Sequence, residues 1–137
     1  MMPIYEDVWK KIKAFSQLYQ GKPIPILNPS IQSTFMITEV SDDYIKIDKI
    51  QIKMTKNMFL SIYDYLKCRG CWVEIGARRV GAHPNTLEGF IKNDLLKGGP
   101  DGLSTATWFA AIIIHADIGI DFNNVAKGQK LRWKLDP

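Results

Sequence analysis

A segment near the carboxyl end, Ala106 to Ala116, is apolar on nearly every side when it is drawn as a helix. Most helices of globular proteins carry one apolar stripe, and a helix that is apolar all round is typical of the protein interior. Ser104 precedes this segment and has the side chain of an N-cap residue. We therefore predict a central, buried helix near 104–116, with the remainder of the chain packed around it.

Apolar residues recur three or four positions apart in three other segments, which predicts three further helices. The first covers residues 5–20 on the stripe Val8, Ile12, Phe15 and Tyr19. The second begins after an N-cap at Thr55, runs through Lys67 and ends near Gly70. The third opens on the capping box of Asn85 and Glu88 and carries Leu87, Ile91 and Leu95.

Strands are predicted where β-branched and aromatic residues alternate with polar ones. The turn residues Ser41 to Asp43 separate two such runs, 34–40 and 44–48, and predict a hairpin. Further strands are expected at 50–54, 71–75 and 129–135. The expected fold is α+β, with one mostly antiparallel sheet of about four or five strands packed against three or four helices.

The size and composition of the chain favour one globular domain. It has 137 residues, of which 46% are hydrophobic and 23% charged. We expect an amino-terminal helix at 5–20, a proline-rich connector at 21–33 and a core at 34–137. The longest apolar stretch, Trp108 to Ile114, is too short to span a bilayer, and the amino terminus lacks a signal-peptide pattern. A cytoplasmic protein without membrane contact is expected.

The residues that most strongly indicate a binding site lie between the predicted strand at 71–75 and the helix predicted after Asn85. Arg78, Arg79 and His83 stand in a loop with two glycines, where a strand leads into a helix. Guanidinium groups donate forked hydrogen bonds to phosphate, and exposed backbone N–H groups at 86–88 would add donors. The alternative is a surface turn whose arginines are solvated or paired with Glu74 or Glu88. A nucleotide-hydrolysing P-loop is excluded, because Ala82 and His83 stand where that motif requires Lys and Ser or Thr.

A second basic group lies on the predicted last strand, where Lys130, Arg132 and Lys134 share one face. Their spacing of about 6.5–7 Å is close to that of phosphates along a nucleic-acid strand. The alternative is an edge strand that keeps charges outward to prevent aggregation. Only a common surface with Arg78 and Arg79 would favour binding over that alternative.

Cys68 and Cys71 form a CxxC pair, and they are the two cysteines of the chain. A redox site places its first cysteine at a helix N-terminus, whereas this pair falls where a helix is predicted to end. A zinc site would need His83 and His115 as further ligands, at spacings unlike those of zinc fingers. Ordinary packing is the alternative for the cysteines, and for His115 it is a hydrogen-bonded position in the core.

The net charge of +4 is spread along the chain and permits an anionic partner without requiring one. The favoured function is binding of the DNA or RNA phosphate backbone through Arg78, Arg79, His83, Lys130, Arg132 and Lys134, with no sequence-reading motif. The main alternative is a protein-interaction module or homodimeric subunit that binds no nucleic acid. A minor alternative is an enzyme that uses Cys71, His83 or Glu88, and no cofactor is expected.

Overall fold

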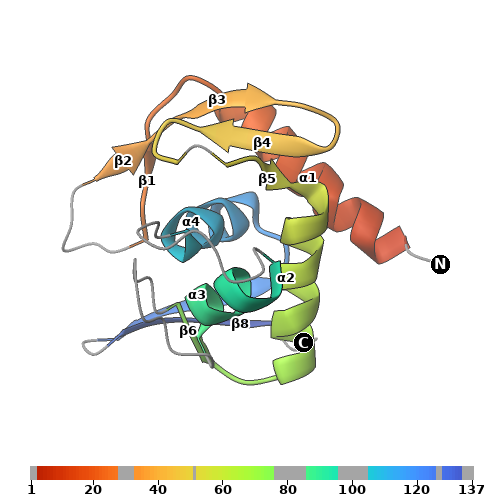
Figure 1. The fold of residues 1–137 in the computed structure, drawn as a ribbon, viewed down its shortest axis with the longest axis vertical. Coiled ribbons are helices and arrows are strands. Elements are labelled where there is room, and N and C mark those ends of the chain that lie inside the picture. Colours follow the sequence, from red (N-terminus) through yellow and green to blue (C-terminus); the bar gives the residue numbers. More distant parts are fainter. Residues whose placement is uncertain are drawn as a thin grey trace.

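The computed structural model describes residues 3–27, 33–50, 52–75, 86–95, 105–125 and 128–133 (Figure 1). The described part has mixed α+β structure, as predicted. Its helices are α1 (Pro3–Tyr19), α2 (Lys56–Arg69), α3 (Leu87–Phe90), which continues as a π-helical turn (Ile91–Leu95), and α4 (Ala106–Ala116). Its strands are β1 (Ile24–Pro25), β2 (Thr34–Phe35), β3 (Ile37–Val40), β4 (Tyr44–Ile47), β5 (Met54–Thr55), β6 (Val73–Glu74), β7 (Ile120–Val125) and β8 (Gly128–Trp133). None of the described helices is long and apolar enough to cross a membrane.

The strands form three small antiparallel sheets, so the prediction of one sheet with four or five strands was wrong. The strand orders are β1-β2, β3-β4-β5 and β6-β8-β7. Figure 1 shows α4 lying between the β3-β4-β5 sheet and the β6-β8-β7 sheet. An apolar helix between them separates the two sheets, and each of them stops at three strands.

The predicted central position of α4 is confirmed. Its residues Ala106, Phe109, Ala110, Ala111, Ile112 and Ile113 are all fully buried. Helix α1 packs against α4, where the Phe15 ring stacks on the His115 ring, and the Phe59 ring of α2 meets the Phe109 ring edge-on, with centroids 4.9 Å apart. Burial of these six residues agrees with the apolar composition of the helix.

Helix α2 is held at both ends by the residues that the sequence indicated. The Thr55 hydroxyl accepts a hydrogen bond from the Met58 N–H at 3.1 Å, which is an N-cap. At the other end, Gly70 adopts a left-handed conformation with φ of 61°, and its N–H donates to the Leu66 carbonyl at 3.2 Å. Glycine takes this conformation without the steric cost that a side chain would bring.

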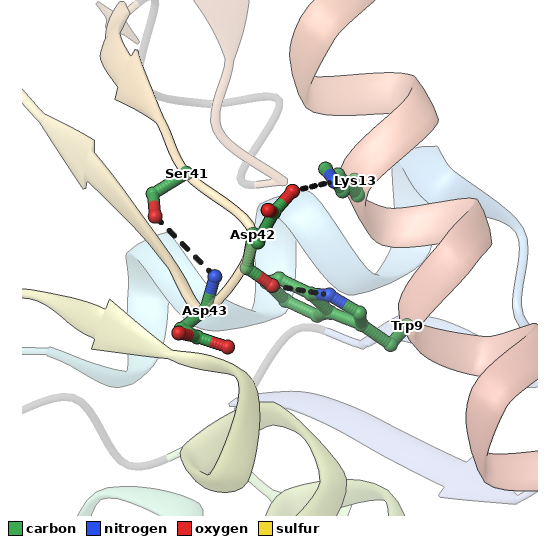
Figure 2. Close-up of polar contacts among 5 residues, drawn as sticks. All are labelled: Trp9, Lys13, Ser41, Asp42 and Asp43. Carbon is green, nitrogen blue, oxygen red and sulfur yellow. Dashed lines mark hydrogen bonds and ion pairs between the residues drawn. The ribbon is translucent and has the colours of Figure 1, made fainter.

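The turn between β3 and β4 fastens its sheet to α1 (Figure 2). The indole N–H of Trp9 donates to the Asp42 carbonyl at 3.0 Å, and Lys13 forms an ion pair with the Asp42 side chain. That hydrogen bond with Lys13 lowers the pKa of the Asp42 carboxyl below its ordinary value. Within the turn, the Asp43 N–H lies 3.4 Å from the Ser41 hydroxyl, to which it donates. The two contacts of Asp42 with α1 link residues about thirty positions apart in sequence.

Strand β7 was not predicted, and it changes the position of the last strand. It pairs with β8 over six registered positions, from Ile120 opposite Trp133 to Val125 opposite Gly128. On its other side, β8 pairs with β6. The last strand is therefore the middle strand of its sheet, so the alternative of an edge strand does not hold.

Candidate nucleic-acid interface

The predicted basic residues are only partly covered by the described structure. Arg78, Arg79 and His83 in the segment 76–85, and Lys134 after β8, lie outside the described residues. Lys130 is half-buried in β8, and Arg132 follows on the same strand. The described parts of this candidate site are therefore Lys130, the backbone of β8 and the residues on either side of the loop 76–85.

The two ends of the loop 76–85 are held together by a backbone hydrogen bond. The Glu88 N–H donates to the carbonyl of Ile75, the last described residue before the loop, at 3.0 Å. One of the three backbone donors expected to face an anion at 86–88 is therefore already engaged. Helix α3 has only four residues before its π-helical turn, so the argument for an anion rests on the loop side chains rather than on a helix dipole.

The sheet register places the start of this loop near one end of β8. Val73 pairs with Leu131 and Glu74 pairs with Lys130, and the two strands run in opposite directions. Continuing this register, β6 leads toward Gly128 and the turn of the β7–β8 hairpin. Lys130 thus lies toward the loop end of β8, while Arg132 and Lys134 follow toward the other end.

Acidic residues stand beside the basic residues of β8. Glu74 on β6 is opposite Lys130, and Asp121 on β7 is opposite Arg132. Opposite charges at such positions stabilise a sheet by direct interaction. In the backbone register, each of these two basic residues therefore has an acidic residue opposite it.

Glu88 has a structural role that no local pattern indicates. Its side chain is fully buried, and its carboxyl oxygens accept hydrogen bonds from the backbone N–H groups of Thr105 and Ala106 at 2.8 and 2.9 Å. The Thr105 hydroxyl donates to the same carboxyl group at 2.6 Å. Glu88 therefore caps the start of α4 from a neighbouring helix, and this buried role does not fit the catalytic role considered for it.

The N-cap residues of α3 and α4 each differ by one position from the predicted ones. The N-cap of α3 is Thr86, whose hydroxyl accepts from the Gly89 N–H at 3.1 Å, rather than Asn85. The N-cap position of α4 is Thr105 rather than Ser104, and Thr105 makes no side-chain cap because its hydroxyl donates to Glu88. Asn85 and Ser104 lie outside the described residues.

The cysteine pair lies where α2 ends, as predicted. Cys68 and Cys71 are both free and exposed, and Cys68 lies in the last turn of the helix. No group of three or more His, Cys, Asp or Glu side chains is placed to hold a metal ion in the described parts of the chain. Cys68, Cys71 and His115 therefore do not form such a group, and His83 lies outside the described residues.

His115 is exposed at the end of α4, so the expectation of a core position was wrong. Its Nε2 lies 3.1 Å from the Pro25 carbonyl oxygen, and its ring stacks on that of Phe15 with centroids 6.0 Å apart. These contacts belong to a cavity of about 200 Å³ lined by Phe15, Tyr19, Pro23, Ile24, Pro25 and His115. No sequence pattern indicates this cavity, because Phe15 and Tyr19 lie on the stripe predicted to face the core.

Comparison with protein-family models, curated proteins and solved structures found no match to this chain.

Proposed function

We propose that this protein binds the phosphate backbone of nucleic acid, without reading base sequence, through the loop 76–85 and the adjoining end of the β7–β8 hairpin. The observation that carries the proposal is the register of β6 with β8. In this register Lys130 is opposite Glu74, two residues before the start of the loop 76–85, whose sequence contains Arg78, Arg79 and His83.

The chain itself limits how far the two arginines can lie from this end of the sheet. Arg78 and Arg79 follow Ile75 by three and four residues, and an extended chain spans at most about 3.6 Å per residue. The sequence adds Lys127 between β7 and β8, at a position outside the described residues. Arginine and lysine side chains at these positions suit contacts with phosphate oxygens.

The order of elements also supports a nucleic-acid partner. From α2 onward the chain runs helix, strand, two helices and a hairpin, and β6 pairs with the second hairpin strand. Helix-turn-helix modules that bind DNA likewise contain two consecutive helices. The likeness is one of topology alone, and the connection at 96–104 is longer than the three or four residues of a typical helix-turn-helix turn.

The burial of α4 restricts the mode of binding. In helix-turn-helix proteins the second helix enters the major groove and contacts base edges. Helix α4 occupies that place in the order of elements, but six of its eleven residues are fully buried. A helix enclosed in this way cannot lie in a groove, so the proposed contacts are confined to phosphates and carry no base specificity.

The test is fluorescence anisotropy with a labelled duplex and a labelled single strand over a series of salt concentrations. We expect a log–log salt slope of about −2 to −4, which corresponds to a few phosphate contacts. Replacing both Arg78 and Arg79 by Ala should weaken binding about 10-fold and make the slope less steep. A matched control replaces the exposed Lys10 and Lys49 by Ala, which removes the same charge. An equal loss in the two double variants, or binding that does not respond to salt, would overturn the proposal.

A further inference from the structure

A groove lies between α1 and the end of α4. It has a volume of about 440 Å³ and adjoins the smaller cavity, since Phe15, Tyr19 and His115 line both. The rest of its lining is Lys11, Ala14 and Leu18 from α1, with Ala116 and Asp117 from the end of α4.

An exposed apolar side chain, that of Leu18, projects beside the apolar hollow of the groove. Leu18 is 65% exposed and Tyr19 is 39% exposed, which makes Leu18 the most exposed large hydrophobic residue of the described chain. Leu18 lies on one stripe of α1 with Lys11, Ala14 and Phe15, because these positions are three or four residues apart. An exposed leucine next to an apolar hollow is typical of a contact surface for another protein.

The charges of the groove indicate what kind of partner fits. Lys11 and Asp117 line it from opposite sides, and both are exposed. Neither belongs to an ion pair among the described residues, unlike Lys13 with Asp42 and Lys56 with Glu6. A partner that is only acidic or only basic would pair with one of the two charges and repel the other. A partner that presents one charge of each sign beside an apolar projection matches both.

We propose that this partner is a second copy of the chain, bound about a twofold axis across the groove. Each Leu18 then enters the hollow of the other copy, and Lys11 of each copy pairs with Asp117 of the other. A twofold interface brings the same surface of both copies together, so it requires a surface that is complementary to itself. The groove meets that requirement in shape, with a projection beside a hollow, and in charge, with Lys11 and Asp117.

The association is tested by sedimentation equilibrium without nucleic acid, over protein concentrations from micromolar to submillimolar. We expect a concentration-dependent rise from the chain mass of 15.6 kDa to twice that value. Leu18→Asp should leave a monomer at every concentration, because it places a charge in the apolar hollow. The control Met36→Asp changes another exposed apolar residue, one that does not line the groove, and should leave the association unchanged.

Charge reversal tests the proposed pairing directly. Lys11→Glu and Asp117→Lys should each weaken the dimer about 10-fold or more, and the double variant should recover most of the loss. Thermal unfolding of each variant shows that it is folded. A wild-type monomer at all concentrations, an equal effect of Leu18→Asp and Met36→Asp, or a double variant weaker than both single ones would overturn the proposal. Each of these results is independent of nucleic-acid binding, which is measured separately.

Discussion

Removing the side chain of Glu88 is expected to be among the most destabilising single changes in this protein. Its carboxyl group is fully buried and accepts three hydrogen bonds at the start of α4, from the N–H groups of Thr105 and Ala106 and from the Thr105 hydroxyl. Each buried donor left without an acceptor costs about 1–3 kcal/mol. Allowing for water that enters the vacated space, we expect Glu88→Ala to lower the free energy of unfolding by about 3–5 kcal/mol.

Urea denaturation with linear extrapolation measures this loss. Glu88→Gln keeps one acceptor oxygen for the two backbone N–H groups, and the Thr105 hydroxyl can turn to accept from the new amide, so we expect a loss of only about 1–2 kcal/mol. The matched control is Thr55→Ala, which removes a half-buried local cap from α2 and should cost about 1 kcal/mol. A loss for Glu88→Ala no larger than that of Thr55→Ala would refute the role of Glu88 as the cap of α4.

Two further predictions concern stability. The lowered pKa of Asp42 implies a stabilising contribution that is present above the ordinary value of 3.8 and is lost as the pH falls through the folded-state pKa. The difference in urea midpoint between wild type and Asp42→Asn should therefore shrink as the pH is lowered from 6 toward about 3, and a pH-independent difference would contradict the ion pair with Lys13. Gly70→Ala should destabilise the protein by about 1 kcal/mol, because φ of 61° is strained for alanine, and Gly70→Asn should cost less. Equal stability of the Ala and Gly proteins in thermal unfolding would show that the left-handed C-cap of α2 contributes nothing.

Elements with a local signal were predicted well. Some features are determined by residues only a few positions away in sequence. They are the apolar stripe of α1, the Thr55 cap and Gly70 end of α2, and the turn at Ser41 to Asp43. The apolar composition of α4 likewise required a buried position, which the structure confirms. In these cases neighbouring residues decide both the local conformation and the face that is buried.

Elements that depend on distant partners were not predictable. Strand β7 contains Asp121, Asn123 and Asn124, residue types that are rare in strands, and it is stabilised by pairing with β8. Without β7, the alternative that the last strand lies at a sheet edge stayed open, whereas the structure places β8 between β6 and β7. The cap of α4 comes from Glu88, seventeen residues before Thr105, so no local pattern reveals it.

The candidate site was predicted only in part for the same reason. The loop residues Arg78 and Arg79 could be singled out from their own sequence, but the acidic neighbours of β8 come from two other strands. Both Lys130 and Arg132 have an acidic residue opposite them, and register places Lys130 nearer to the start of the loop than Arg132. We accordingly expect Lys130 to contribute more to binding than Arg132.

Amide chemical-shift mapping by ¹H–¹⁵N NMR, with an unlabelled short duplex added at low salt, tests the central claim most directly. We predict that the largest shifts fall on residues 76–85 and 126–130, that they diminish as salt is added, and that the amides of α4 change little. Shifts centred on α4, shifts spread evenly over the exposed lysines, or none at all would contradict the account.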